Sequence, residues 1–274
     1  MTTPLVGNAG QDPMFSGAQA YERFMGAWSR ELAPLFVRFA GVKDGEAVLD
    51  VGSGTGALSA AVLAAAPSGR IVGIDPAAPY VAFAQSRQGS PRVTFETGDA
   101  QQMRFADREF DRTLSLLVMN FIPDRDRAMK EMIRVTRPNG TIAAGVWDYG
   151  DGMEFLRVFW DEVVAQNPAA GAKDEGHMPL CRKGELGALW RGHGLLDVEE
   201  TALTIPTRFT NFADYWSRFL EKQGPAGAYV AAMSENDREQ LRLRLQKRLV
   251  GAGPDRPIDM TARVWAVKGR VPPK

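Results

Sequence analysis

The sequence predicts an α/β protein: a Rossmann-like, seven-stranded and mostly parallel sheet with helices on both faces. Three observations lead to this class. Short apolar segments rich in β-branched residues alternate with helical segments along residues 41–150. A glycine-rich turn, GSGTG, directly follows the first apolar segment. The first three apolar segments end in or beside an aspartate, as strands do at the ligand-binding edge of an open parallel sheet.

The first strand is expected at Val48, Leu49 and Val51, which flank Asp50. A short run of β-formers is typical of a central parallel strand that is covered on both faces. The glycines that follow remove Cβ atoms where the chain turns sharply, so that a ligand can approach the backbone amides. Residues 57–66 are rich in Ala and Leu and predict a helix whose free N–H groups point at that ligand.

Four more strands continue the alternation. They are expected at residues 70–75, 92–96, 110–116 and 141–147. Asp75 closes the first of them, and Asp99 follows the second. Residues 124–136 predict a helix, and the turn at 137–140 ends it before the last of these strands. Residues 41–150 therefore form the predicted ligand-binding core.

The segment in front of this core, residues 1–40, is expected to be helical where it meets the sheet. Residues 1–18 are rich in Gly and Pro and lack periodicity, which predicts a mobile segment or a strap over the site. Residues 21–40 place their apolar side chains on one helical face, and Pro34 is expected to divide this helix into two pieces.

The remainder, residues 151–274, is expected to add lid or insert helices and the strands that complete the same sheet. The predicted helices cover residues 153–166, 183–191, 211–222 and 235–250. The predicted strands cover residues 197–205 and 260–267, and a loop spans residues 167–179. Ser234, with Asp237 three residues later, is expected to cap the last helix.

Four segments in a fixed order carry a resemblance to a known family. They are VLDVGSGTG (48–56), IVGIDP (71–76), TGDA (97–100), and FDRTLSLLVMNFIPD (110–124) leading to RVTRPNGTIAAG (134–145). Over roughly residues 20–150 the chain resembles the class I S-adenosylmethionine-dependent methyltransferases, and is similar to the ubiquinone and menaquinone biosynthesis type. The resemblance implies S-adenosyl-L-methionine as methyl donor, S-adenosyl-L-homocysteine as product, and a last strand that runs antiparallel to its neighbours.

The resemblance also implies roles for individual residues. Asp50 would attract the ammonium group of the donor, Asp75 would accept both ribose hydroxyls, and Asp99 the adenine amino group. The other implied contacts come from the glycine turn, the strand ends and a helical N-terminal cap: Gly52, Ser53, Gly54, Gly56, Pro76, Ala100, Leu116, Leu117, Tyr21, Met25, Trp28 and Ser29.

Two other classes fit parts of the same sequence. Gly52, Gly54 and Ala57 also satisfy the dinucleotide pattern, and an acid at Asp75 suits an NAD(P)-dependent oxidoreductase. However, Asp50 beside a pyrophosphate would repel it, which favours the methyl donor. A noncatalytic protein that binds S-adenosylmethionine is the second alternative.

The sequence does not assign a catalytic residue. Direct displacement from a sulfonium needs no obligatory base, and His177, Tyr149 and Asp148 are the candidates for an optional one. Asn120 starts the run Asn-Phe-Ile-Pro, where methyltransferases of bases or glutamine carry an Asn/Asp-Pro-Pro-aromatic motif. The absence of that motif, together with the balanced charge of the chain, argues against DNA or RNA adenine as acceptor.

Composition favours a small-molecule acceptor. The 33 basic and 33 acidic residues cancel, so no broad attraction to nucleic acid or membrane is implied. No signal peptide or membrane-spanning run is apparent, and Cys181 is the single cysteine, so a cytoplasmic protein without a metal site is expected. The aromatic residues after residue 146 suggest an apolar or aromatic acceptor, although residues at these positions fit the core of the protein equally well: Trp147, Tyr149, Phe155, Phe159 and Trp160. The oligomeric state is not predicted.

Overall fold

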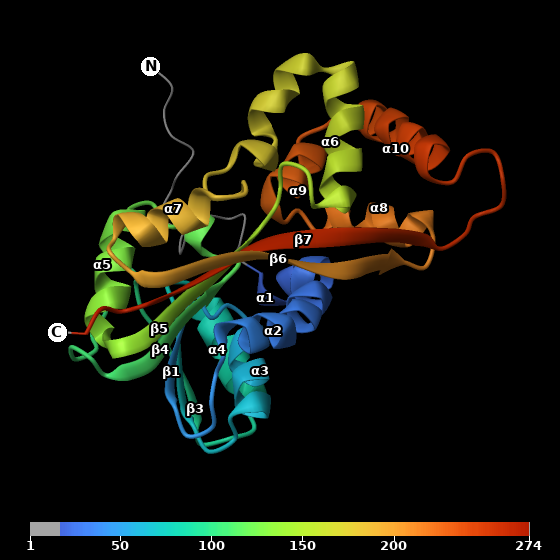
Figure 1. Ribbon diagram of the computed structural model, residues 1–274. Coiled ribbons are helices and arrows are strands. Elements are labelled where there is room, and N and C mark those ends of the chain that lie inside the picture. The colour runs from blue at the N-terminus through green and yellow to red at the C-terminus, as the bar shows by residue number, and fades with distance from the viewer. Residues whose placement is uncertain (1–16, 274) are drawn as a thin grey trace.

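The computed structural model describes residues 17–273, which build one seven-stranded sheet in the order β3-β2-β1-β4-β5-β7-β6 (Figure 1). The strands are β1 (Ala47–Val51), β2 (Arg70–Asp75), β3 (Val93–Thr97), β4 (Phe110–Leu116), β5 (Thr136–Trp147), β6 (Leu196–Phe209) and β7 (Ile258–Arg270). The predicted fold class is therefore confirmed. The prediction for residues 1–18 falls almost entirely outside the described residues.

The strand order reverses between β1 and β4. From β1 the chain proceeds outward through β2 to β3, and then crosses back to β4 on the other side of β1. Neighbouring strands from β3 to β5 are parallel, whereas β7 is antiparallel to both β5 and β6, as predicted. In open α/β sheets, ligands bind beyond the carboxyl ends of the strands at such a reversal.

Two boundaries differ from the sequence prediction because strand pairing decides them. The predicted turn at residues 137–140 belongs to β5, where Phe110 pairs with Thr136 and Arg112 with Thr141, so that the extra residues form a bulge. Asn139 adopts a left-handed φ of 63° within this bulge. β6 and β7 are both longer than predicted, because they pair with each other along most of their lengths.

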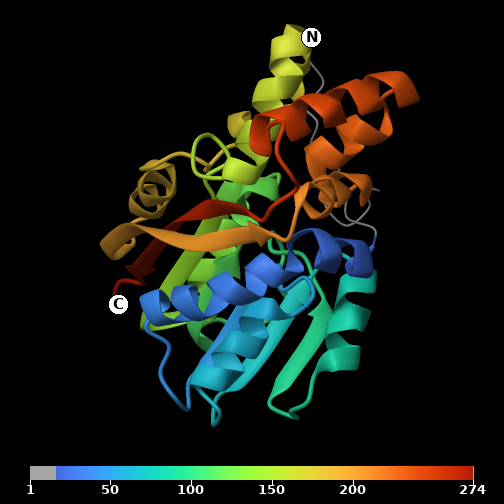
Figure 2. The same cartoon turned by 90° about the vertical axis from the view of Figure 1, so that its right-hand side faces the viewer.

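Helices cover both faces of the sheet (Figures 1 and 2). One face carries α2 (Ala27–Ala40), α3 (Ala57–Ala65) and α4 (Ala78–Arg87), and the other carries α5 (Arg125–Val135) and α7 (Glu185–Gly192). Asp124 caps α5 by accepting a hydrogen bond from the Arg127 amide at 2.9 Å. Both layers bury the sheet, which explains the near-continuous apolar character of β1 and β4.

The N-terminal helix is irregular in a different place from the one predicted. Pro34 lies inside α2 without dividing it, on the exposed side of the helix, where water can replace the missing backbone hydrogen bond. The irregularity is a π-helical turn, Glu22–Gly26, between α1 (Ala18–Tyr21) and α2. Such turns are frequent at functional sites.

A group of helices stands beyond the carboxyl ends of the strands (Figure 1). It consists of α6 (Glu154–Gln166), α8 (Phe212–Leu220), α9 (Gly224–Ala231) and α10 (Glu235–Leu249). Ser234 caps α10 as predicted, because its Oγ accepts from the Asp237 amide at 3.1 Å. Helix α9 was not predicted, since its Gly-Pro-Ala-Gly start has the composition of a turn.

Stacked aromatic rings hold these helices together. Phe155 and Phe159 of α6 stack on Phe219 of α8, with ring centroids 4.7 and 4.3 Å apart. Both α6 rings are fully buried. Of the two interpretations that the sequence left open for Phe155 and Phe159, the structure therefore supports core packing, because both rings are buried between helices. Within residues 17–273, no helix combines the length and apolar character needed to cross a membrane.

Candidate functional site

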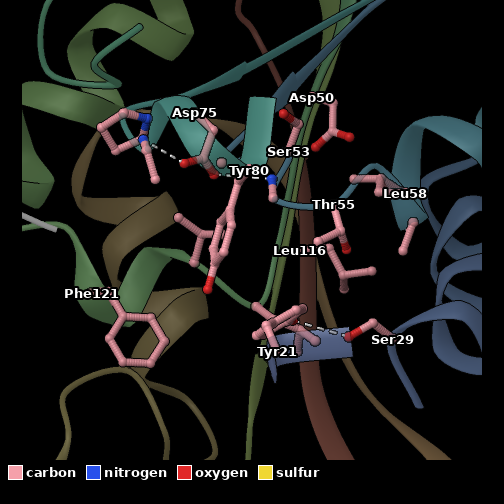
Figure 3. Close-up of a pocket in the computed structure, with 17 residues that line it drawn as sticks. Tyr21, Ser29, Asp50, Ser53, Thr55, Leu58, Asp75, Tyr80, Leu116 and Phe121 are labelled. Carbon is pink, nitrogen blue, oxygen red and sulfur yellow. Dashed lines mark hydrogen bonds between the residues drawn. The ribbon is translucent and has the colours of Figure 1, made fainter. Parts of the chain in front are cut away.

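A cavity opens at the reversal point, beyond the ends of β1, β2 and β4 (Figure 3). It contains about 840 Å³ of empty space, part of which is open to solvent. Ten of the residues predicted from the sequence line it: Tyr21, Ser29, Asp50, Gly52, Ser53, Gly54, Asp75, Pro76, Leu116 and Leu117.

Asp50 is a buried carboxylate with unused hydrogen-bonding capacity. Its side chain is 1% exposed, and Oδ2 accepts a hydrogen bond from Ser59 Oγ at 2.7 Å. Oδ1 is buried and has no partner among the described residues. The pKa of Asp50 is raised to about 7, chiefly by burial and also by the nearby charge of Asp75, while the hydrogen bonds from Ser59 act to lower it. Such a group is suited to a ligand that brings a cation or an N–H donor.

Asp75 lies across the same cavity and is held by the backbone. Oδ2 accepts from the Gly54 amide at 3.0 Å, and Oδ1 accepts from the Ala77 amide at 2.9 Å. Burial raises its pKa, and these two amides lower it. Because each carboxylate oxygen has two lone pairs, both retain one for a ligand hydroxyl.

The glycine turn needs its glycines for conformation and for space. Gly52 has a φ of +73°, and a Cβ there would lie 2.5 Å from both Val118 Cγ atoms. The amides of Gly52 and Ser53 both donate to the carbonyl of Ile74, which ties the turn to β2. Gly56, with a φ of +90°, ends the turn outside the cavity lining, where a Cβ would approach the buried Phe95 ring.

The π-helical turn is attached to the glycine turn. Thr55 Oγ1 donates to Glu22 Oε1 at 2.6 Å, and the Tyr21 hydroxyl lies 3.2 Å from Ser29 Oγ (Figure 3). Tyr80 of α4 reaches the same cavity, with its ring centroid 5.7 Å from that of Tyr21. The buried Tyr80 hydroxyl has no partner among the described residues. Tyr80 was not among the residues predicted from the sequence, because its spacing is that of an ordinary helical core residue.

Several predicted residues lie elsewhere. Trp28 packs edge-on against Phe155 and Phe209 in the aromatic core, with ring centroids 5.4 and 5.7 Å away, because it faces the other side of its helix. The structure therefore does not place Trp28 over the cavity. Asp99 and Ala100 lie outside the lining, and the exposed Asp99 carboxylate accepts from the Gln101 amide at 2.8 Å. Their predicted contacts with adenine stay predictions.

A second cavity adjoins the first. It contains about 520 Å³ of empty space, part of which is open to solvent. The two share Tyr21, Leu117 and Phe121. The rest of the lining comes from the N-terminal turn, the end of β5, α6, the loop before α7 and the start of α9: Phe24, Met25, Trp147, Tyr149, Leu156, Glu175, Gln223, Gly224 and Pro225. A lid was predicted in this region from the sequence, whereas Glu175 and Gln223 were not predicted as site residues.

The three candidate bases have different surroundings. Asp148 is engaged by Arg263, whose Nη2 lies 2.6 Å from its Oδ2. His177 is exposed and lines a separate polar cleft with Asp148 and Arg157. Tyr149 lines the second cavity, and burial raises its pKa well above the usual value. No cluster of three or more metal-ligating side chains occurs in residues 17–273.

Comparisons with known proteins agree with this geometry. The model of the methyltransferase domain family matches residues 49–144. An uncharacterized protein of Mycobacterium tuberculosis is 30% identical over 226 residues, covering 78% of this chain and 80% of that protein. A ubiquinone/menaquinone biosynthesis C-methyltransferase of Bdellovibrio bacteriovorus is 32% identical over 117 residues, 42% of this chain and 48% of its own.

A solved structure shows the same fold. It is a phosphoethanolamine N-methyltransferase of Haemonchus contortus in complex with phosphomonomethylethanolamine and S-adenosylhomocysteine, with a TM-score of 0.57 and 21% identity. The match covers 96% of this chain and 58% of that one. The motif order, the strand topology and these relatives together lead to one conclusion. The chain belongs to the class I S-adenosylmethionine-dependent methyltransferases.

Proposed function

We propose that this methyltransferase binds S-adenosylmethionine in the first cavity and transfers its methyl group to a small-molecule acceptor. The observation that carries the proposal is the buried Asp50, whose Oδ1 has no partner among the described residues and which faces Asp75 across one cavity. A ligand with an ammonium group at one end and vicinal hydroxyls at the other satisfies both carboxylates. S-adenosylmethionine has both groups and carries no phosphate.

The residues of the first cavity fit the parts of this ligand in turn. Asp50 would take the ammonium, Asp75 the ribose hydroxyls, and the turn from Gly52 to Gly54 the backbone contacts near the sugar. Leu116 and Leu117 would form an apolar wall. Ser53 and Pro76 line the same space, and Tyr21 and Ser29 would cover it. Asp99 and Ala100 remain the predicted adenine contacts.

When bound, S-adenosylmethionine supplies a methyl group that is already activated by the positive sulfur. The chain therefore has to align the acceptor atom in line with that methyl group, at roughly 3–3.5 Å, and exclude water. Tyr21, Leu117 and Phe121, which border both cavities, are positioned to do so. Equal numbers of acidic and basic residues support a small acceptor over nucleic acid, and a cytoplasmic location stays a prediction.

Calorimetric titration separates this proposal from its rivals. We expect S-adenosylmethionine and S-adenosylhomocysteine to bind, and NADH to bind far more weakly, since its pyrophosphate would face Asp50. Tight NADH binding alone would establish the oxidoreductase function instead. Incubation with isotopically labelled donor and a metabolite extract, followed by mass spectrometry, then tests turnover. Donor binding without any labelled product would favour the noncatalytic alternative.

Replacing Asp75 with alanine tests the ribose contact. We expect the affinity for S-adenosylmethionine to fall by about 1–3 kcal/mol, because charge-assisted hydrogen bonds to two hydroxyls are lost. Asp259→Ala is the matched control, because Asp259 is an exposed acid that pairs with the exposed Arg208. Calorimetry should show normal binding for the control, and an unchanged dissociation constant in Asp75→Ala would remove Asp75 from the donor site.

Replacing Tyr21 with alanine tests the N-terminal cap. We expect donor affinity to drop about tenfold, because the ring borders both cavities and its loss opens the first one to water. Tyr21→Phe keeps the ring and removes only the contact with Ser29, so it should bind nearly as the parent does. If the alanine variant binds the donor as tightly as the phenylalanine variant, the turn does not cover the bound ligand.

A further inference from the structure

We infer that the second cavity holds the methyl acceptor and that Glu175 accepts the proton this acceptor loses. The inference rests on the proposed function, and it specifies the acceptor class. The acceptor would be a flat, largely apolar molecule that presents one phenolic or enolic hydroxyl to Glu175.

The position of the second cavity follows from its shared wall with the first. Tyr21, Leu117 and Phe121 line both, so a molecule in the second cavity borders the proposed donor site. Leu117 has a left-handed φ of 67°, which is unusual for a leucine, and its amide donates to the Gly145 carbonyl at 2.7 Å. Backbone strain of this kind concentrates at functional sites. The chain thus holds a costly conformation at the junction of the two cavities.

The lining of the second cavity selects an apolar, flat ligand. Phe24, Met25, Trp147 and Leu156 are all buried side chains that contribute to its wall. Aromatic and thioether groups of this kind favour rings and hydrocarbon over charged ligands.

Glu175 is the charged group in this apolar wall, and the fold holds it in place. Its side chain is 4% exposed, Oε1 accepts from the Ala226 amide in the first turn of α9 at 3.0 Å, and Oε2 accepts from Trp160 Nε1. Two donors on a carboxylate leave further lone pairs unused. Burial raises its pKa to about 7, so the carboxylate is basic enough to take a proton near neutral pH.

A second acceptor in the same wall indicates what the ligand must bring. Gln223 is buried and lines the cavity, and its Oε1 has no partner among the described residues. Its Nε2 donates to the Glu221 carbonyl at 3.3 Å, so the amide end that remains available is an acceptor. Where a ligand meets Glu175 and Gln223, it therefore has to supply the donors.

A hydroxyl suits this arrangement better than an amine. A phenol has an ordinary pKa of about 10 and carries one proton to lose, which matches one carboxylate. An alkyl amine would arrive protonated, so its nitrogen would have no free lone pair for the attack, and an ion pair with Glu175 would favour that protonated form. In the proposed step the acceptor O–H bond breaks with its proton passing to Glu175, an O–CH₃ bond forms, and the S–CH₃ bond breaks with its electron pair left on sulfur.

A matched pair of fluorescent probes tests the inference. In the presence of saturating S-adenosylhomocysteine, the parent protein should bind 7-hydroxycoumarin at least about tenfold more tightly than 7-methoxycoumarin, which lacks the proton. In Glu175→Gln this preference should fall to less than about twofold, since an amide is a weaker acceptor than a carboxylate. A merely structural role for Glu175 would weaken both probes equally and leave the ratio unchanged.

Control measurements distinguish a failure of the inference about Glu175 from a misfolded variant and from a failure of the proposed function. Glu235→Gln changes an exposed acid on α10 and should keep the parent preference. The amide oxygen introduced by Glu175→Gln cannot accept from both the Ala226 and the Trp160 donors, so the variant could fold poorly. Its affinity for S-adenosylhomocysteine checks that it is folded. The ratio of the two probe affinities in the parent protein does not depend on this variant. Equal binding of both probes by the parent, or tighter binding of 7-(aminomethyl)coumarin, overturns the inference. If the parent protein does not bind S-adenosylhomocysteine, the proposed function itself is wrong.

Discussion

Asp50→Asn is expected to stabilise the ligand-free protein at pH 8 and to weaken its binding of S-adenosylmethionine. The carboxylate is buried and raised to a pKa of about 7 from 3.8, so its charged form is unfavourable in the folded protein. Asparagine removes the charge and can still accept the bond from Ser59. A destabilising buried charge can be retained in a protein where a ligand binds to that charge. Asp50→Asn should therefore raise the stability of the ligand-free protein and lower its affinity for the donor.

The pH dependence follows from the direction of this shift. A carboxyl group whose folded pKa is raised contributes most to stability below its unfolded pKa, near 3.8, and that contribution is lost as the pH rises through about 7. The full loss is of the order of 4 kcal/mol, from about 1.4 kcal/mol per pKa unit. Asparagine should recover roughly 1–3 kcal/mol of this lost stability. The recovery is incomplete because the amide N–H groups of asparagine would be buried at this position without hydrogen-bond partners.

Urea unfolding at pH 5 and pH 8 measures the effect. The difference between variant and parent cancels the contribution of Glu175, whose pKa is also raised to about 7. We expect Asp50→Asn to be more stabilising at pH 8 than at pH 5, and donor affinity at pH 8 to fall about 100-fold as the charge pair with the ammonium is lost. Ser59→Ala is the control: it keeps the charge and should destabilise the protein. A stabilised variant that binds the donor normally would show that Asp50 is not the ammonium partner.

Gly52→Ala is expected to cost about 2–5 kcal/mol of stability and to abolish donor binding. A left-handed φ costs a residue with a Cβ about 1–2 kcal/mol, and the overlap with Val118 adds about 1–3 kcal/mol. Val118 also lines the first cavity, so its displacement would fill the space of the ligand.

Gly54→Ala is a close control within the same turn. Its φ is +51°, but nothing lies within 4 Å of the Cβ position. It should therefore lose only about 1–2 kcal/mol in urea unfolding. Val118→Ala should restore part of the stability of Gly52→Ala, because it removes the overlapping methyl groups. Equal costs at the two glycines, or no rescue, would show that the contact with Val118 is unimportant.

Residue patterns predicted the elements whose structure depends on residues close together in the sequence. The β-formers around Asp50, the glycine turn and the Ala- and Leu-rich helix after it predicted a strand, a turn and a helix, and all three are present. Because parallel strands connected by right-handed crossovers bring their carboxyl ends to one edge, Asp50 and Asp75 were expected to meet, and they line one cavity. Trp28 and α9 could not be predicted, since the choice of helix face and the burial of a Gly-Pro-rich helix depend on neighbouring elements.

The sheet, the family and the edge at which the donor is expected could all be predicted from residue patterns, because strand periodicity and turn chemistry act over a few residues. The second cavity could not, because it depends on packing that brings together Phe24, Tyr149, Glu175 and Gln223 from four distant parts of the chain. The tertiary structure also decided the raised pKa values of Asp50 and Glu175. Desolvation is a property of everything packed around a group, and no local pattern encodes it.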